Sequence, residues 1–257
     1  MVAAKAMQTV REAIEAHGGM DYWNSLEALD VEISASGFLF TAKRRPVLRR
    51  VRMRAATREP RFSFFDFPKP GQTSELIGND EVRILDSDGK IVARRENPRA
   101  AFRGIRRQFI WDDLDFIYFG GYATWNYLTA PFMLARKGFL IETLEPLQGA
   151  LGQFTRLHVT FPADVPTHSR EQVFYFDDQR LLRRLDYTAE VVGGWARAAH
   201  LCDEYRTFDR LKAPTSRHVL PLLFGHTPLP GPILVALEVH NISPVPASPV
   251  RSSAMTI

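Results

Sequence analysis

The sequence contains a single cysteine, Cys202, so neither a disulfide within the chain nor a cysteine-based metal cluster is available. It also lacks any run of about 18 consecutive apolar residues, which predicts that no helix spans a membrane. The N-terminal segment MVAAKAMQTVREAIEAHGG has no uninterrupted apolar stretch of the kind that signal peptides carry. We therefore expect a cytoplasmic protein, or a periplasmic one if a signal peptide has been removed.

Catalytic and cofactor-binding motifs of fixed spacing are missing as well. The sequence has no G-x-S-x-G, no P-loop, no G-x-G-x-x-G, no C-x-x-C and no H-E-x-x-H. The common hydrolase, nucleotide-binding and redox motifs are thereby excluded, and we expect neither a metal nor an organic cofactor. The net charge of +4 is too small to indicate nucleic-acid binding.

What the chain does contain is a long series of strand-like segments. After a helix-like segment at residues 5–17, the apolar period changes from 3.6 residues to 2, as in the alternation over residues 29–36. Short turns separate most of these segments, which predicts a strongly curved antiparallel sheet of about ten to twelve strands. We expect one domain over residues 1–245, followed by a flexible tail at residues 246–257.

One segment interrupts the strand pattern: FIWDDLDFIYFGGYATWNYLTAPFMLARKG, residues 109–138. It begins with Asp112 and Asp113, whose charges favour the N-terminus of a helix. We expect residues 109–137 to be helical and to lie on the concave face, because a curved sheet has to cover its apolar side. The segment would be both plug and lid of a ligand cavity, to which it contributes aromatic side chains: Trp111, Tyr118, Tyr122 and Trp125.

Two predicted hairpins decide which side chains face this cavity. If Gly193-Gly194 forms a two-residue turn, His200 lies opposite Tyr187, and opposite charges meet on the other face. Facing opposite charges are typical of a solvated surface, so the face of His200 is the inner one. A second turn at residues 178–179 adds apolar ligand-binding candidates to the same face: Phe174, Phe176 and Leu185.

An inward histidine beside a tyrosine has two interpretations. The pair is either a hydrogen-bonded part of an ordinary core or the acid-base group of a small-molecule site. If the cavity is catalytic, His200 with Tyr187 is the first candidate, His158 the second and His168 the third, because both other histidines precede the hairpin and could approach the same end of the cavity. The reaction would be a cofactor-independent lyase, isomerase or hydrolase step on an apolar or aromatic substrate.

A basic run, KRRPVLRRVRMRAATR, carries eight positive charges from Lys43 to Arg58. Within it, Arg50, Arg52 and Arg54 share one strand face, which is typical of a solvated surface. The run has no aromatic residues that could stack on bases, so it does not indicate nucleic-acid binding. A weak acidic partner or an anionic head group at these strands is a third functional alternative, that of a surface-interaction protein.

The helix ending EAHGGMDYWNSLEAL, followed by a meandering sheet with a helical insert, resembles the lipoprotein-carrier superfamily of LolA and LolB. The segments HVTFPADVPTHSREQVFYFDDQRLLRRLDY and HLCDEYRTFDRLKAPTSRHVLP resemble an uncharacterised bacterial branch of it. This resemblance covers most of residues 5–222 and implies an α+β, mainly β fold, an open or half-closed β-barrel around helices. It also implies an apolar concave surface that binds acyl chains or other hydrophobic ligands. Those carriers are periplasmic, so the missing signal peptide favours the hydrophobic cavity over lipoprotein transport.

Replacing His200 by Gln separates the carrier and enzyme hypotheses. The substitution keeps a polar group of similar bulk and removes the titration, so it would lower turnover by about a hundredfold or more if His200 were the acid or base. We expect the variant to fold and to bind ligand as the parent does. A loss of turnover of that size in a folded variant would support the enzyme.

Overall fold

The computed structural model describes residues 2–149, 152–223 and 225–248. The helices in these ranges are α1 (Val2–Ala16), α2 (Met20–Asn24), α3 (Phe38–Ala42) and α4 (Asp113–Thr129), with 3₁₀ helices η1 (Pro98–Arg103), η2 (Ile105–Gln108) and η3 (Phe132–Ala135). The strands are β1 (Leu26–Ser36), β2 (Leu48–Ala56), β3 (Arg61–Phe65), β4 (Thr73–Ile77), β5 (Glu81–Leu85), β6 (Ile91–Glu96), β7 (Leu140–Gly149), β8 (Gly152–Thr160), β9 (Glu171–Phe176), β10 (Leu182–Thr188), β11 (Arg197–Phe208), β12 (Leu211–Pro221) and β13 (Val235–Pro246).

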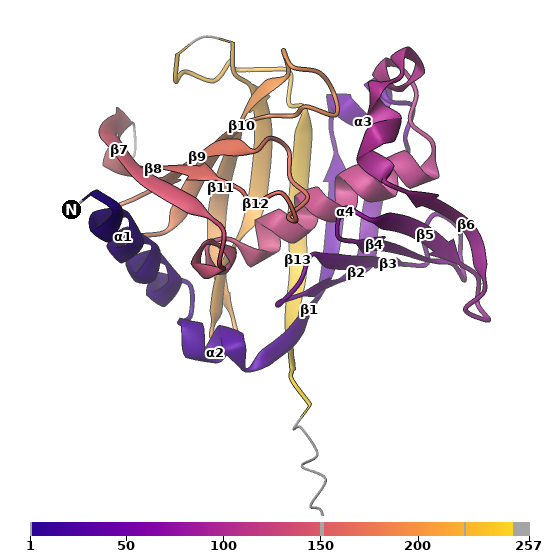
Figure 1. Ribbon diagram of the computed structural model, residues 1–257, viewed down its shortest axis with the longest axis horizontal. Coiled ribbons are helices and arrows are strands. Elements are labelled where there is room, and N and C mark those ends of the chain that lie inside the picture. Colours follow the sequence, from indigo (N-terminus) through magenta and orange to yellow (C-terminus); the bar gives the residue numbers. More distant parts are fainter. Residues whose placement is uncertain (1, 150–151, 224, 249–257) are drawn as a thin grey trace, which may run out of the picture.

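All of these strands belong to one antiparallel sheet of 13, in the order β6-β5-β4-β3-β2-β1-β13-β12-β11-β10-β9-β8-β7 (Figure 1). Neighbours in the sheet are neighbours in the chain except at the centre, where β1 pairs with β13. Strands β6 and β7 are the two edges and do not pair with each other, so the sheet curves without closing into a barrel. The predicted mainly β, curved and open architecture is confirmed.

The sheet has one strand more than the upper end of the predicted range. Strand β4 lies between β3 and β5, and the sequence pattern did not reveal it. Its core-facing residues are Ser74 and Leu76, both wholly buried. A strand of five residues with only one large apolar residue on its inner face gives too weak an alternation to be recognised.

The inner faces of the two predicted hairpins are confirmed, but their registers are wrong. His200 pairs with Leu185 and not with Tyr187. Likewise, Leu185 pairs with Phe174 and not with Gln172. Both of these pairings are displaced by two residues, and because side chains alternate across a strand, an even displacement leaves these side chains on their predicted face.

The register differs because the connection between β10 and β11 is wider than two residues. The amide of Ala189 donates to the carbonyl of Ala196 at 2.8 Å, so the chain reverses over residues 190–195. Gly193-Gly194 lies inside this loop, with Gly193 at a φ of 159°. The glycine pair therefore predicts the position of the turn correctly, but the turn spans residues 190–195 and not two residues.

Helix α4 occupies the centre of the segment predicted to be helical, and η2 and η3 flank it. Asp112 is its N-cap: the Asp112 side chain accepts from the Asp115 amide at 2.9 Å, and the Asp115 side chain accepts from the Asp112 amide at 3.0 Å. This reciprocal arrangement satisfies two of the free amides at the start of the helix. The role predicted for Asp112 at the helix N-terminus is confirmed.

Helix α4 crosses the concave side and contacts both halves of the sheet (Figure 1). Towards one half, the indole Nε1 of Trp125 donates to the carbonyl of Ala56 in β2 at 2.8 Å. Towards the other half, the hydroxyl of Tyr127 lies 2.9 Å from that of Tyr187 in β10. The predicted plug is thus a single helix that joins the two inner faces.

Helix α2 and the end of β13 lie close together at the foot of the sheet (Figure 1). The ring of Trp23 in α2 stacks on Phe132 at 4.2 Å between centroids. Strand β13 runs to Pro246, and the amide of Ala247 donates to the carbonyl of Ser25 at 2.8 Å. Residues 249–257 of the predicted tail lie outside the described residues. Among the described helices, none has the length and hydropathy that a membrane crossing requires.

Two neighbouring glycines of α4 test how tightly the helix sits against the sheet. A Cβ added at Gly120 would lie 3.4 Å from the Phe64 ring, an ordinary contact, whereas one at Gly121 would lie 3.1 Å from the Cβ of Leu76. Alanine raises helix propensity at both positions by about 1 kcal/mol. We expect Gly120→Ala to leave the free energy of unfolding unchanged or higher, and Gly121→Ala to be less stable than Gly120→Ala by about 1 kcal/mol or more. Equal stability of the two variants in urea unfolding would contradict this packing.

Candidate ligand-binding site

An apolar cavity of about 280 Å³ lies between α4 and the inner face of the sheet. Strands β1, β12 and β13 form one wall, α3 and the loop before β11 form the rim, and α4 forms the opposite wall. The side of α4 that lines the cavity repeats at helical spacing and comprises Phe116, Phe119, Gly120, Ala123, Thr124 and Tyr127.

The space exists because this side of α4 carries small residues at its centre. Gly120, Ala123 and Thr124 face the cavity, whereas Gly121 on the adjoining side is pressed against Leu76. Facing them across the cavity are further short side chains, such as Ala35 of β1. The helix is therefore tightly packed on β4 and held away from the centre of the sheet.

Exposed apolar side chains surround the mouth of the cavity. Phe38, Trp195 and Leu223 line it and are 55%, 77% and 54% exposed, respectively. Large exposed apolar side chains gathered at one opening are unusual for a surface that has no partner. They extend the apolar wall of the cavity out to solvent.

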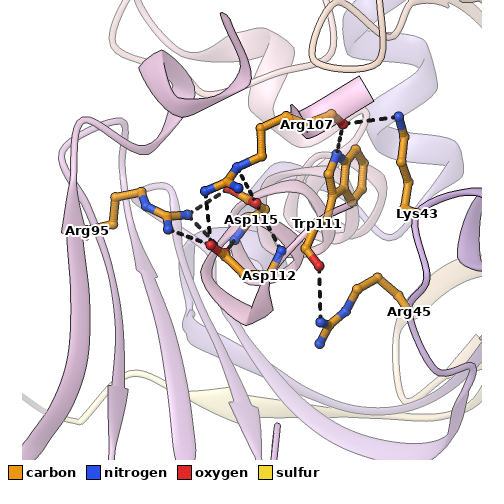
Figure 2. A network of polar contacts seen from close by, with 7 residues as sticks. All are labelled: Lys43, Arg45, Arg95, Arg107, Trp111, Asp112 and Asp115. Carbon is orange, nitrogen blue, oxygen red and sulfur yellow. Dashed lines mark hydrogen bonds and ion pairs between the residues drawn. The ribbon is translucent and has the colours of Figure 1, made fainter. Parts of the chain in front are cut away.

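The mouth also holds a buried cation, Lys43, which follows α3. Its ammonium donates to the carbonyl oxygen of Gln108 at 2.5 Å. It also donates to the carbonyl oxygen of Arg107 at 3.3 Å and lies 5.3 Å from the centre of the Trp111 ring (Figure 2). Burial lowers the pKa of the Lys43 ammonium. No carboxylate of the described residues forms an ion pair with it; the neighbouring Arg45, in contrast, pairs with Asp113.

The start of α4, beside this mouth, is fixed by a charge cluster (Figure 2). Arg95 donates to Asp112 at 2.8 Å and to Asp115 at 2.7 Å, and Arg107 lies 2.6 Å from Asp115. Burial alone would raise the pKa of Asp112, but the hydrogen bonds from Arg95 and the Asp115 amide, together with the charges of Arg95 and Arg107, outweigh it and lower the pKa to about 2. Two arginines face two carboxylates in this cluster, whereas Lys43 has no carboxylate partner among the described residues.

The inner end of the cavity is polar and uncharged. His168 and Tyr187 line it, and their rings stack at 4.0 Å with an interplanar angle of 6°. The hydroxyl of Tyr127 lies 2.7 Å from Nε2 of His168 and 2.9 Å from the hydroxyl of Tyr187, and the hydroxyl of Tyr122 lies 3.3 Å from Nδ1 of His168. Burial lowers the pKa of His168 to about 3 and raises the pKa values of all three tyrosines, so each group is neutral near pH 7.

His200 lies directly behind this end and is wholly buried. Its ring meets the Tyr127 ring edge to face at 4.2 Å, its Nε2 lies 3.4 Å from Nη1 of Arg217, and its Nδ1 has no hydrogen-bond partner among the described residues. Burial, followed by the charge of Arg217, lowers the pKa of His200 well below its ordinary value. Arg217 also donates to the Tyr127 carbonyl at 2.8 Å and contacts the sulfur of Cys202 at 3.2 Å.

The structure brings together only part of the predicted catalytic set. His168 and Tyr187 share the cavity, and His200 lies one layer behind them. The expectation that His158 approaches the same end is wrong: Leu157 pairs with Phe174 on the inner face, so the adjacent His158 points to the outer face, 3.8 Å from Glu171.

The predicted ligand-binding residues divide in the same way. The structure places Trp111 on the cavity wall. The remaining six are buried in the core that supports this wall: Tyr118, Tyr122, Trp125, Phe174, Phe176 and Leu185. Lys43 does not stand out in the sequence, because it belongs to the basic run. Helix α3 does not stand out either, since its only sequence signal is Gly37, at a φ of 125° after β1.

Three arginines of the basic run, all on β2, point away from this site. Arg50, Arg52 and Arg54 of β2 pair with Glu32, Asp66 and Asp30, respectively. Each of these arginines is about half exposed or more, so the pairs lie at the surface and contribute little to stability. Their charges are balanced locally, as on a solvated face.

Comparison with known proteins identifies the fold. Neither protein-family models nor curated sequences give a match. A putative outer membrane lipoprotein-sorting protein domain from Vibrio parahaemolyticus has a TM-score of 0.55 at 10% identity, covering 94% of this chain and 93% of that one. A LolA superfamily protein from Nitrosomonas europaea has a TM-score of 0.53 at 11% identity, covering 95% of this chain and 94% of that one. A DUF1329 family protein from Desulfovibrio piger has a TM-score of 0.51 at 11% identity, covering 92% of each chain. The LolA-like fold that the sequence resembles is therefore confirmed over most of the chain.

The buried histidines make stability depend on pH. The folded pKa is lowered to about 4 for His17 and to about 3 for His168, and lies well below 6.5 for His200. The unfolded chain then binds more protons than the folded one below pH 6.5, so stability is fully present above that pH and is lost as pH falls. Between pH 7 and 5 we expect the free energy of unfolding to fall with a slope that approaches about 1.4 kcal/mol per pH unit for each histidine. Urea unfolding should show a smaller slope in His200→Gln; equal stability of the parent at pH 5 and 7 would contradict the burial of these groups as neutral imidazoles.

Proposed function

We propose that this protein binds a hydrophobic small molecule or a single acyl chain in the cavity between α4 and the inner face of the sheet. The observation that carries the proposal is the cavity itself, apolar along its walls and bordered by exposed Phe38, Trp195 and Leu223. Concave, mostly apolar sites with a few placed polar groups are how proteins take up small ligands.

The size of the cavity supports one compact ligand. Ligand sites usually enclose about 300–1,000 Å³, and this one, at about 280 Å³, lies at the lower end. One of the structures with this fold is described as a lipoprotein-sorting domain, which supports a hydrophobic ligand here as well. A cavity of this size suits one chain or one ring system better than a multiply acylated lipid.

The charges of the mouth support a neutral or anionic ligand over a cationic one. Lys43 is buried there without a carboxylate partner among the described residues, and exposed Arg197 lies on the same rim. A cationic ligand would be repelled by both groups, and its own desolvation would not be compensated. Lys43 is the group best placed to meet an anionic end of a ligand.

Catalysis is the second candidate function, and one observation favours it: a histidine and two tyrosines are hydrogen-bonded at the inner end of the cavity. Their pKa values argue against proton transfer near neutral pH. Burial lowers the pKa of His168 to about 3 and raises that of Tyr187 well above its ordinary value. An efficient acid or base has a pKa near the operating pH, so these groups are better suited to binding than to catalysis.

Filling the cavity tests the proposed function. Ala123→Leu places three additional carbons in the cavity, whereas Ala4→Leu makes the same change on the exposed surface of α1. With a dansyl-labelled undecanoic acid as the fluorescent probe, we expect the dissociation constant to rise by about tenfold or more in Ala123→Leu, because the added side chain takes the place of ligand atoms. The Ala4→Leu variant should bind as the parent does. Equal binding by all three proteins would show that the probe does not occupy this cavity.

Replacing Lys43 tests the part of the proposal that concerns charge. Lys43→Met keeps an unbranched apolar stem and removes the ammonium, and Lys137→Met makes the same change at an exposed position. We expect Lys43→Met to raise the dissociation constant of the labelled acid by about tenfold, the size of a hydrogen bond to a charged group. The dissociation constant of its methyl ester should not change. An equal loss for acid and ester would assign Lys43 a purely structural role at the mouth.

A further inference from the structure

The polar groups at the inner end of the cavity form a chain with three contacts. It runs from the hydroxyl of Tyr122 to Nδ1 of His168 (3.3 Å), from Nε2 of His168 to the hydroxyl of Tyr127 (2.7 Å), and from there to the hydroxyl of Tyr187 (2.9 Å). These hydroxyls form no further hydrogen bond with the described residues. The hydrogen-bonding groups of these four side chains therefore have to pair with one another or with a ligand atom in the cavity.

The hydrogens of this chain outnumber its contacts. Each tyrosine hydroxyl carries one hydrogen, and a neutral imidazole carries one on either Nδ1 or Nε2. Four groups supply one hydrogen each, and the three contacts can hold only one each. One hydrogen is always left over, and protonation of His168 would leave two.

The position of the surplus hydrogen depends on the tautomer of His168. If Nδ1 carries the hydrogen, Tyr127 and Tyr187 donate along the chain, and the surplus hydrogen belongs to Tyr122. If Nε2 carries it, Tyr122 donates to Nδ1, and the surplus hydrogen belongs to Tyr127 or Tyr187. Tyr122 is wholly buried away from the cavity, whereas Tyr127 and Tyr187 both line it.

Burial selects between the two arrangements. A hydroxyl hydrogen left unsatisfied in a dry interior disfavours its arrangement by about tenfold or more. At Tyr122 the surplus hydrogen has no acceptor, but at Tyr127 or Tyr187 an oxygen atom inside the cavity can accept it. The Nε2 tautomer, with a donor directed into the cavity, is therefore the arrangement that a ligand oxygen stabilises.

We infer that the inner end of the cavity donates one hydrogen bond to its ligand, which is an apolar molecule with a neutral oxygen acceptor, a ketone, aldehyde or ester carbonyl, at its buried end. The inference rests on the proposed function, because it names the class of ligand for the same cavity. A carboxylate fits this end less well, since the groups facing it are neutral and a single donor does not compensate for the burial of an anion. The cation at the opposite end, Lys43, lies at the mouth.

Two probes of the same shape test this inference: 2-acetylnaphthalene, which has a ketone oxygen, and 2-isopropenylnaphthalene, which has a methylene group in its place. Either Tyr127 or Tyr187 can supply the donor, and Nε2 of His168, which also lines the cavity, would take over once both hydroxyls are removed, so all three residues have to be changed together. The variant Tyr127→Phe/His168→Phe/Tyr187→Phe should raise the dissociation constant of the ketone by about fivefold relative to that of the hydrocarbon, the size of one neutral hydrogen bond. Tyr122→Phe is the matched control, because it removes a hydroxyl outside the cavity and keeps those of Tyr127 and Tyr187.

The carbonyl stretch of a bound ¹³C=O-labelled ketone gives a second readout that does not depend on affinity. In the parent and in Tyr122→Phe, the band should lie at the lower frequency of a hydrogen-bonded carbonyl, and in the triple variant it should shift to the frequency found in an apolar solvent. A ketone band at the apolar-solvent frequency in the parent, or an unchanged ketone preference in the triple variant, would overturn the inference. If the parent binds the hydrocarbon and the ketone with equal affinity, the cavity binds ligands but donates no hydrogen bond. If neither probe binds the parent, the proposed function fails and the inference fails with it.

Discussion

The connection from β6 to β7 is the constraint on which the rest of the structure depends. These two strands follow one another in the chain and form opposite edges of the sheet, so residues 97–139 have to pass across it. The concave face is apolar and has to be covered, and α4 accomplishes both tasks (Figure 1). Its reciprocal cap and the pairing of Asp112 and Asp115 with two arginines fix where the helix starts, and its hydrogen bonds to β2 and β10 fix where it lies.

The cavity follows from the uneven surface of this helix. On the side of β4, Gly121 allows close contact with Leu76, whereas on the side of β1 and β13 small side chains leave room. The space ends inward at neutral hydroxyl and imidazole groups and outward at Lys43 and exposed apolar side chains. This gradient, from an uncharged interior to a cationic mouth, suits an amphipathic ligand that enters with its less polar end first. It suits acid-base catalysis poorly, because burial holds the histidine and tyrosines in their neutral forms.

Alternation along strands predicted the inner face more reliably than turn chemistry predicted the register. His200, Leu185 and Phe174 lie on the predicted face although each pairing is displaced by two residues, because an even displacement preserves the face. The same rule, applied to Leu157, would have placed His158 on the outer face. The sequence could not place His168 or Lys43, since both lie outside strands and their positions depend on tertiary packing against α4. Nor could it locate the cavity, which arises where small residues distant in the chain face one another.

The central claim is that a hydrophobic ligand lies between α4 and the sheet, and nuclear Overhauser effects from a ¹³C-labelled acyl probe test it most directly. Ala123 of α4 and Val219 of β12 carry methyl groups on opposite walls of the cavity, whereas Leu140 is 66% exposed on the edge strand β7. The account predicts cross-peaks from the probe chain to the methyl groups of both Ala123 and Val219. Cross-peaks confined to exposed methyl groups such as those of Leu140 would contradict it.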